Sequence, residues 1–240
     1  MKASINRRDV YKRTAVEEGW RARSAYKIMQ INETLHIFDG KTKIVDLCAA
    51  PGSWSQVAAK MTDSKIIVAI DLRQIKPIDG VIQIKGDITS EETARDVIRR
   101  FNGEKADVVM SDPAPDCVGR IEFDEYFQHG LVRASLAIAT MLLDDGGIFV
   151  SKIFRTRHID SVLAQIGCFF SEVYIAKPRA SRLSSVESFV VAKGFKCPEG
   201  YAPSLITANL PSGDVPDAKF VCCGDLYGFD SERTYPLDED

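Results

Sequence analysis

The feature that most constrains the fold of this chain is a regular alternation of short apolar segments with helical ones. Five segments rich in Val and Ile, each of a length typical of buried strands, occur in the first two thirds of the chain, and helical segments separate most of them. Such alternation is typical of strands joined by right-handed crossovers. It predicts an α/β fold with a mostly parallel sheet and helices on both faces. The strand segments span residues 44–47, 65–72, 80–88, 106–112 and 146–154.

The pattern changes after residue 157. A helix is expected over 159–166, and two further strand segments follow at 170–177 and 188–195, with only the polar loop 178–187 between them. Two strands joined by a loop without a helix indicate that the sheet closes with an antiparallel member. We therefore expect seven strands.

The two ends of the chain carry opposite charge. A net charge of −3 by itself argues against a polyanionic partner, because nucleic-acid affinity depends on Lys and Arg. The first thirty residues nevertheless hold eight basic residues against three acidic ones, whereas the last thirty hold eight acidic ones. We expect residues 1–197 to form the domain, with basic helices within 1–35 facing a nucleic acid, and 198–240 to form an acidic, loosely structured tail. Ser24 is placed to cap an amphipathic helix over 24–35.

Apolar runs and cysteine spacing indicate the cellular compartment that we expect for this chain. No run of about 18 apolar residues is present, and the N-terminus lacks the apolar centre of a signal peptide. The six cysteines include no C-x-x-C pair, and the three histidines lie far apart. We expect a cytoplasmic protein with reduced thiols, without a membrane segment, a disulfide framework or a metal site.

The loop after the first strand segment, residues 48–53, is the first candidate for a ligand site. In an open α/β sheet, ligands bind beyond the carboxyl ends of the strands, normally next to the first strand. The loop reads CAAPGS, so its small side chains let a ligand approach the backbone, and Gly52 can adopt a positive φ. The G-x-G-x-x-G pattern of dinucleotide sites is missing. The loop therefore suits a ligand without phosphates.

Acidic residues follow several of the strand segments. Asp71, Asp87 and Asp112 come at the ends of the second, third and fourth segments, and Asp46 lies near the end of the first. A carboxylate about 20 residues past the loop is well placed to accept the ribose hydroxyls of an adenosine, and Asp71 fits that position. One strand-end Asp is usually a turn or cap residue. Four at one edge of a sheet suit a cationic ligand such as a sulfonium.

The motifs VDLCAAPGSWSQ, GDI, SDPAP, FVSKIF and KPRASRLSSVESFVV occur in this order within residues 7–195. Together they resemble the FtsJ/RrmJ family of RNA ribose 2′-O-methyltransferases. The motifs RARSAYK, SDPAPD and CCGDLYGFDSERTYPL look most like the eukaryotic branch that acts on tRNA anticodon loops. The chain departs from the family at Pro113, where Met or Gly is common. The resemblance implies a Rossmann-like methyltransferase fold that binds S-adenosylmethionine.

The resemblance also implies roles for single residues. The family's catalytic set is Lys-Asp-Lys-Glu, and by motif it falls on Lys27, Asp112, Lys152 and Glu187. Lys152 would act at the 2′ oxygen, either as the proton acceptor or as the group that orients the oxygen. The implied cofactor contacts are Gly52, Trp54, Asp71, Asp87 and Asp112.

A basic surface is expected around this site, because Arg and Lys contact phosphates without base specificity. Unpaired bases can also stack on aromatic side chains, and Tyr26 and Phe154 are the candidates for that role, with a core role favoured for Phe154. The predicted RNA contacts are Arg21, Arg23, Arg155, Arg179 and Arg182, and the wider set adds Arg7, Arg8, Arg157 and Lys177.

With the tail motif CCGDLYGFDSERTYPL, the leading interpretation is 2′-O-methylation in the tRNA anticodon loop, at the wobble nucleotide 34 and at nucleotide 32. A second interpretation keeps the chemistry and moves the substrate to ribosomal RNA or an mRNA cap. A third is a non-catalytic RNA-binding or scaffold protein on a methyltransferase fold, which an altered catalytic set would support, and none of the four residues is altered. The tRNA branch also implies a large helical-repeat or propeller-type subunit that selects the nucleotide, docked by the acidic residues 214–240.

Overall fold

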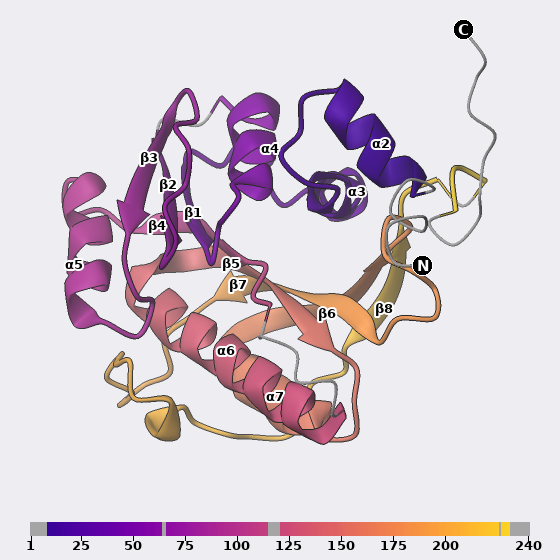
Figure 1. The fold of residues 1–240 in the computed structure, drawn as a ribbon. Coiled ribbons are helices and arrows are strands. Elements are labelled where there is room, and N and C mark those ends of the chain that lie inside the picture. The colour runs from indigo at the N-terminus through magenta and orange to yellow at the C-terminus, as the bar shows by residue number, and fades with distance from the viewer. Residues whose placement is uncertain (1–8, 64–65, 115–120, 226, 231–240) are drawn as a thin grey trace, which may run out of the picture.

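The fold, taken from a computed structural model, is built on one sheet with the strand order β3-β2-β1-β4-β5-β7-β6-β8 (Figure 1). The structure describes residues 9–63, 66–114, 121–225 and 227–230. Helices α3 and α4 cover one face of the sheet, and α6 and α7 cover the other (Figure 1). The predicted α/β fold with a mostly parallel sheet is confirmed.

The strands follow the apolar segments of the sequence, and helices connect most of the parallel ones. The strands are β1 Lys43–Leu47, β2 Ile66–Asp71, β3 Val81–Lys85, β4 Ala106–Ser111, β5 Leu143–Phe154, β6 Phe170–Pro178, β7 Glu187–Phe195 and β8 Lys219–Cys223. The helices are α2 Val10–Glu17, α3 Ser24–Leu35, α4 Ser53–Met61, α5 Glu91–Arg100, α6 Ile121–Leu142 and α7 Ile159–Gly167, with a 3-10 turn η1 Thr207–Asn209.

Strand pairing gathers the functional segments at one edge of the sheet. β1 lies between β2 and β4, and β5 runs parallel to β4, so these four strands end at the same edge. β7 runs antiparallel to both β5 and β6, as expected. Its first residue, Glu187, pairs with the last residue of β5, Phe154. The start of β7 therefore lies at the same edge as the ends of the parallel strands.

Two apolar cores, one on each face, hold the sheet in place. Val45 and Leu47 of β1 pack into the core beneath α5, α6 and α7, whereas Ile44 packs into the core beneath α3 and α4. This alternation with a period of two is what a sheet buried on both faces requires. Because burial fixes the register of each strand, the residues at the strand ends have defined positions.

The C-terminal segment is more ordered than the sequence predicts. Lys219–Cys223 forms an eighth strand parallel to β6, so the expectation of seven strands and of a loosely structured tail from residue 198 is wrong for this part. Cys223 is buried, and Leu210 packs into the core. A strand of five residues after an irregular stretch gives too short a pattern for detection. Residues 231–240, the end of the predicted acidic tail, lie outside the described residues.

Across the described parts of the chain, no helix combines the length and the apolar character that crossing a membrane needs. The same parts hold no group of three or more His, Cys, Asp or Glu side chains that could bind a metal ion. Five cysteines are free thiols, and Cys117 lies outside the described residues.

Candidate active site

A cavity of about 670 Å³ opens at the edge where the parallel strands end. This is where ligand sites form in open α/β sheets, and the volume lies within the range of about 300–1,000 Å³ that is typical of small-molecule sites. The loop after β1 and the segments after β2, β3 and β4 form most of its wall. The lining includes Ser24, Asp46, Cys48, Ala49, Ala50, Pro51, Ser53, Trp54, Asp71, Asp87, Thr89, Asp112, Pro113 and Lys152.

Gly52 shapes the loop after β1. Its φ of 103° lies in the left-handed region that favours glycine. A Cβ at this position would stand 2.7 Å from Cδ1 of Ile78 and 3.0 Å from the guanidinium of Arg21. The backbone conformation therefore favours glycine, and a Cβ would also displace the ends of the Ile78 and Arg21 side chains. Gly52 has no side chain, so the predicted cofactor contact could involve only its backbone, and that contact stays a prediction.

Trp54 and Ser24 join the start of α4, directly after the β1 loop, to helix α3. Trp54 is 2% exposed, packs on Phe189 with ring centroids 5.7 Å apart, and donates from Nε1 to the carbonyl of Ser24 at 2.9 Å. The hydroxyls of Ser24 and Ser53 are 2.7 Å apart and share a hydrogen bond. Arg23 holds the N-cap position of α3, so the prediction that Ser24 caps this helix is wrong. These contacts fix α3, which carries Lys27, to the cavity wall.

Asp71 and Asp87 line the cavity and are oriented by local donors. Asp71 accepts hydrogen bonds from the backbone N–H groups of Ala50 and Arg73, both at 2.8 Å. The Arg73 side chain lies 3.4 Å from Asp71, but it is 76% exposed, so solvent weakens that ion pair. Asp87 accepts from the N–H and the hydroxyl of Thr89 at 2.8 and 2.7 Å. Neutral donors thus hold both carboxylates in place.

Asp46 is the most deeply buried carboxylate in the cavity wall. It is 1% exposed, and burial raises its pKa to about 7, opposed by a 2.5 Å hydrogen bond from Ser55 and helped by the charge of Asp112. The second oxygen of Asp46, Oδ1, has no hydrogen-bond partner within the described chain. Burying an unpaired carboxylate oxygen costs free energy. A positive charge bound in the cavity would offset that cost.

Lys152 and Asp112 form an ion pair at the floor of the cavity. Lys152 emerges from β5 and is 6% exposed, and its Nζ lies 2.9 Å from Oδ1 of Asp112. The sheet sets this proximity, because Ser111 of β4 pairs with Ser151 of β5. Gln128 of α6 donates to the carbonyl of Lys152 at 2.7 Å and fixes its backbone.

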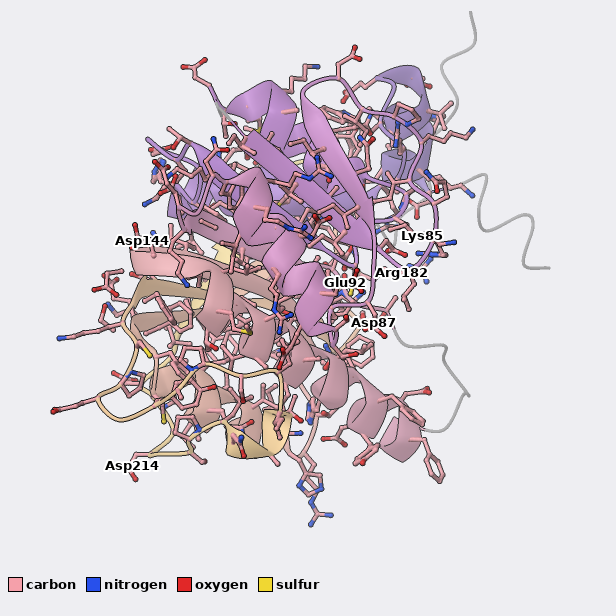
Figure 2. The ribbon with its side chains drawn as sticks, turned by 90° about the vertical axis from the view of Figure 1, so that its left-hand side faces the viewer. Lys85, Asp87, Glu92, Asp144, Arg182 and Asp214 are labelled. Carbon is pink, nitrogen blue, oxygen red and sulfur yellow. The ribbon has the colours of Figure 1, made fainter. Side chains whose placement is uncertain are left out.

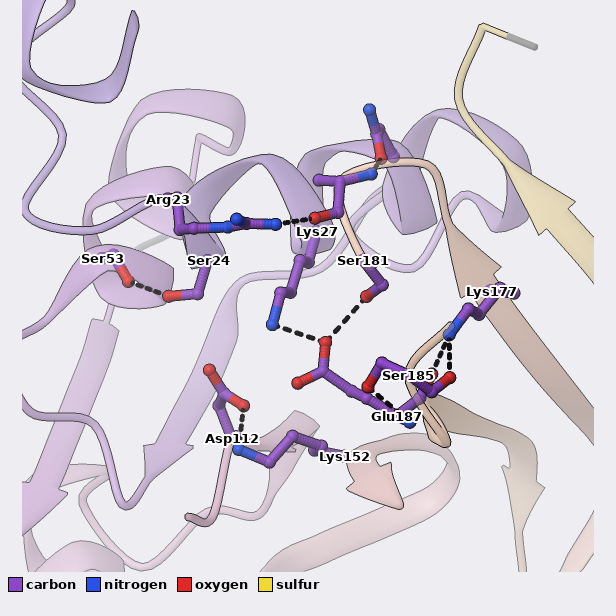
Figure 3. A network of polar contacts seen from close by, with 12 residues as sticks. Arg23, Ser24, Lys27, Ser53, Asp112, Lys152, Lys177, Ser181, Ser185 and Glu187 are labelled. Carbon is purple, nitrogen blue, oxygen red and sulfur yellow. Dashed lines mark hydrogen bonds and ion pairs between the residues drawn. The ribbon is translucent and has the colours of Figure 1, made fainter. Parts of the chain in front are cut away.

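Lys27 and Glu187 form a second ion pair beside the first (Figure 3). Nζ of Lys27 lies 2.6 Å from Oε1 of Glu187, which also accepts a hydrogen bond from Ser181 at 2.8 Å. Burial would raise the pKa of Glu187, but the charge of Lys27 and the hydrogen bonds from Lys27 and Ser181 hold that pKa below its ordinary value. The structure brings together all four residues that the motifs single out. Their catalytic role stays a prediction.

The loop between β6 and β7 is held by contacts that the sequence does not reveal. Lys177, predicted to contact RNA, donates instead to the carbonyls of Ser185 and Glu187 at 2.7 and 2.6 Å. Gln30 of α3 accepts from the N–H of Ala180 at 2.9 Å. These contacts and the Ser181 hydrogen bond orient Glu187. A Ser, Lys or Gln in a polar stretch carries no signal for such long-range roles.

Arg21, also predicted to contact RNA, ties two loops together. Its guanidinium donates to the carbonyl oxygens of Pro51, Lys76 and Pro77 at 3.0, 2.7 and 2.5 Å. Its own N–H donates to Oε1 of Gln56 at 2.9 Å. Arg21 therefore joins the loop after β1 to the loop after β2, both of which border the cavity.

The other predicted RNA contacts divide into paired and exposed arginines. Arg23 forms an ion pair with Asp9 and donates to a backbone carbonyl, and Arg179 lies 3.6 Å from Asp230. Arg155 and Arg182 are exposed, whereas Arg7 and Arg8 lie outside the described residues. Figure 2 labels Arg182, which belongs to the loop between β6 and β7. An RNA role for any of these arginines stays a prediction.

Comparison with known proteins points to one family. Residues 20–195 match the family of FtsJ-like methyltransferases. The human tRNA (cytidine(32)/guanosine(34)-2′-O)-methyltransferase is 47% identical to this chain, with 99% of this chain and 76% of the human protein covered. A Schizosaccharomyces pombe protein of the same name is 43% identical, with 99% of this chain and 88% of that protein covered.

A solved structure shows the same fold. A Plasmodium falciparum protein described as a ribosomal RNA methyltransferase superposes with a TM-score of 0.65 at 25% identity. The match covers 73% of this chain and 98% of the Plasmodium chain.

Proposed function

Because this chain belongs to the FtsJ-like methyltransferase family, we propose that it methylates ribose 2′-hydroxyls in the tRNA anticodon loop, at nucleotides 32 and 34. The names of its relatives support the substrate. The observation that carries the chemistry is the meeting of two Lys–carboxylate pairs beside a cavity lined by further carboxylates. The sequence-based expectation of a cytoplasmic location stays a prediction.

S-adenosylmethionine fits the donor set of the cavity. When bound, this cofactor supplies an electrophilic methyl group on a positively charged sulfur. Asp71 and Asp87 line the part of the cavity after β2 and β3, where we place the ribose hydroxyls and the adenine. The unpaired oxygen of Asp46 supports a cationic ligand on the opposite side, near Asp112. Trp54 supports the site by anchoring the loop to α3.

The reaction needs alignment and removal of one proton. Methyl transfer breaks the sulfur–carbon bond, forms a bond between the 2′ oxygen and the methyl carbon, and releases the hydroxyl proton. We place Lys152 at the 2′ oxygen, since its Nζ is buried, lines the cavity and is held 2.9 Å from Asp112. The proton goes to the lysine amine if that amine is neutral, and otherwise to Asp112 or water. Positioning of reactants contributes on the order of 7–11 kcal/mol in favourable cases, so the hydroxyl must be held in line with the methyl group whichever group accepts the proton.

The Lys27–Glu187 pair would position the target ribose. Glu187 is held in its ionised form, because its pKa is lowered by Lys27 and Ser181 against the effect of burial. An ionised Glu187 in turn holds the Lys27 ammonium at the centre (Figure 3). Lys27 can then donate a hydrogen bond to the ribose or to its phosphate.

Labelled S-adenosylmethionine and unmodified tRNA test the proposal directly. Wild type and Lys152→Ala are compared with and without cell extract, and 2′-O-methyl sites are mapped. We expect label at nucleotides 32 and 34 that depends on Lys152. Label on ribosomal or capped RNA alone would move the substrate to another RNA class, and cofactor binding without label on any RNA would support a scaffold protein.

We further propose that a large helical-repeat or propeller-type subunit selects the nucleotide, and that acidic residues near the C-terminus dock it. Since β8 belongs to the sheet, deletion from residue 198 would expose the edge of β6. Removing only residues 231–240 leaves β8 intact. Loss of a co-purifying subunit and of one of the two methylation sites supports the proposal, whereas unchanged methylation and unchanged co-purification argue against it.

A further inference from the structure

Helix α6 begins with three exposed aromatic side chains that the proposed mechanism does not use. Phe123, Tyr126 and Phe127 are 51%, 73% and 49% exposed. They stand at positions i, i+3 and i+4, so they share one face of the helix. The rings of Tyr126 and Phe127 are 5.8 Å apart and nearly perpendicular, at 73°. Single exposed apolar residues are ordinary, but three aromatic rings side by side mark an interaction surface.

The helix that carries this aromatic stripe is bonded, through its opposite face, to Lys152 and to the segment that follows it. Gln128, which directly follows Phe127, donates to the carbonyl of Lys152 at 2.7 Å and accepts from the N–H of Phe154 at 3.3 Å. Glu125 accepts from the N–H of His158 at 2.9 Å. The buried face of α6 is thereby bonded to the chain that leaves Lys152. The same end of the helix extends beyond the body of the domain at the lower right of Figure 2.

Cationic side chains lie on the segment that is bonded to α6. Arg155 and Arg157 are exposed on the short segment that follows Lys152 and that α6 contacts. The guanidinium of Arg155 lies 5.4 Å from the ring centroid of Phe220, which is 64% exposed. Aromatic faces beside guanidinium groups are typical of surfaces that bind unpaired nucleotides, because the rings stack on bases and the cations contact phosphates.

The arginines on the segment bonded to α6, rather than the composition of the stripe, favour RNA over a protein partner. Within the described side chains of α6, the large apolar residues that are exposed are all aromatic, and none is Leu, Ile or Met. Aromatic rings anchor protein interfaces and also stack on bases, so the rings alone do not choose between the two partners. The exposed guanidinium groups of Arg155 and Arg157 favour RNA, because they contact phosphates.

We propose that Phe123, Tyr126 and Phe127 form a stacking platform for unpaired bases next to the nucleotide being methylated. This inference rests on the proposed function, and it explains how one enzyme could methylate target nucleotides with different bases. Stacking does not read base identity, so one platform serves both a cytidine and a guanosine target. The platform would hold a neighbouring base while the target ribose enters the site beside Lys152.

Leucine substitutions separate stacking from plain apolar contact. We would compare Tyr126→Phe, Tyr126→Leu and the double variant Tyr126→Leu/Phe127→Leu in the full chain, with cell extract present to supply any required subunit. Met61→Ala, which changes a 40% exposed apolar residue at the end of α4, is the matched control. Stacking on an aromatic side chain predicts that the double variant raises the KM for tRNA about 5-fold to 150-fold, whereas Tyr126→Phe and Met61→Ala stay within about 2-fold. Cofactor affinity, measured by calorimetry, should not change in any variant.

Three results would overturn the platform. The first is that the double leucine variant methylates tRNA as wild type does. The second is that leucine at positions 126 and 127 preserves the KM for tRNA but alanine at the same positions raises it, because that pattern indicates docking of a protein. If wild type methylates no tRNA, the proposed function fails, and direct binding then decides the platform. Wild type should bind a labelled single-stranded RNA more tightly than a duplex of equal length, and the double variant should lose that preference. The third contrary result is that wild type and the double variant bind the single-stranded RNA with equal affinity.

Discussion

Two regions of the cavity stabilise their carboxylates in different ways. Asp46, Asp71 and Asp87 form the proposed cofactor side, and the Lys152–Asp112 and Lys27–Glu187 pairs form the proposed reaction centre. On the cofactor side, Asp71 and Asp87 are held by backbone N–H groups and a hydroxyl, and Asp46 by a serine. At the reaction centre, Asp112 and Glu187 each face a lysine within 3 Å, at 2.9 and 2.6 Å. Neutral donors fix an orientation without cancelling charge, whereas lysines cancel it.

This difference corresponds to two tasks. Negative charge that only the exposed Arg73 partly offsets attracts a cation into the cavity, which suits a sulfonium cofactor. Paired charges add little net field, and their hydrogen bonds instead fix the geometry in which a hydroxyl meets the methyl group. Changes on the cofactor side should therefore alter affinity for S-adenosylmethionine, and changes at the centre should alter turnover.

The largest expected effect breaks the reaction centre alone. Lys152→Ala should lower kcat by about 100-fold to 10,000-fold, the usual contribution of a positioned proton-transfer group, because it removes the group at the 2′ oxygen. The dissociation constant for S-adenosylmethionine should change by less than about 3-fold, since one lost lysine leaves Asp46, Asp71 and Asp87 in place. Single-turnover kinetics and calorimetry measure the two quantities. A matched loss of cofactor affinity would mean that the two regions are not separate.

A smaller effect should appear when the cofactor side is changed. Asp71→Asn removes the negative charge and keeps the shape of the side chain. A hydrogen bond to a charged group contributes about 1.5–3 kcal/mol, so we expect the KM for S-adenosylmethionine to rise roughly 10-fold to 150-fold. At saturating cofactor, kcat should remain within a few-fold of wild type. A loss confined to kcat would contradict the separation, and thermal unfolding of the variant checks that the fold is retained.

Arg21 sharpens the comparison, because the sequence predicts an RNA contact and the structure shows a clamp on two loops of the cofactor side. Arg21→Lys keeps the positive charge but cannot reach three carbonyl oxygens with one planar group. We expect the KM for S-adenosylmethionine to rise about 3-fold to 10-fold, with the KM for tRNA unchanged. Steady-state titration of each substrate distinguishes the roles. If only the KM for tRNA rises, Arg21 contacts RNA after all.

The sequence predicts the parallel sheet well because its signals are local. Periodic apolar segments mark β1, β2, β4 and β5, and strand-end carboxylates such as Asp71 follow them directly. Register then brings Asp112 beside Lys152 without further information. Strand β8 escapes prediction, because five residues after an irregular stretch show no period.

The parts of the site that the sequence misses depend on contacts between distant segments. Arg21, Arg23 and Lys177 are all predicted from the sequence to contact RNA, yet each donates to backbone carbonyls. The carbonyls that Arg21 and Arg23 bind lie far along the chain, and those that Lys177 binds lie 8 and 10 residues away. Whether an arginine contacts RNA or its own backbone depends on which loops fold next to it. Composition and spacing contain no such information, so basic residues are the least predictable part of this site.

The smallest expected effect concerns Asp46, which ties the charge of the cofactor side to pH. Burial raises the pKa of Asp46 to about 7 from an ordinary value near 4, so the folded protein binds a proton that the unfolded chain releases. This contribution to the free energy of unfolding is fully present below about pH 4 and is lost as the pH rises through 7. In Asp46→Asn, the free energy of unfolding should fall less between pH 5 and 8 than in wild type, because this contribution is missing. Chemical denaturation at several pH values would measure the difference.

The same carboxyl should make cofactor binding depend on pH. A bound cation favours ionised Asp46 and lowers its pKa, and each unit of that change corresponds to a factor of about ten in affinity. Because the complex then binds fewer protons than the free protein, affinity for S-adenosylmethionine should increase about 3-fold to 10-fold between pH 6 and 8, with proton release on binding. Calorimetry in buffers of different ionisation enthalpy measures both. Asp46→Asn should abolish the pH dependence of cofactor affinity. If the variant keeps that dependence, another group in the cavity titrates, and the charge that distinguishes the cofactor side is not the charge of Asp46.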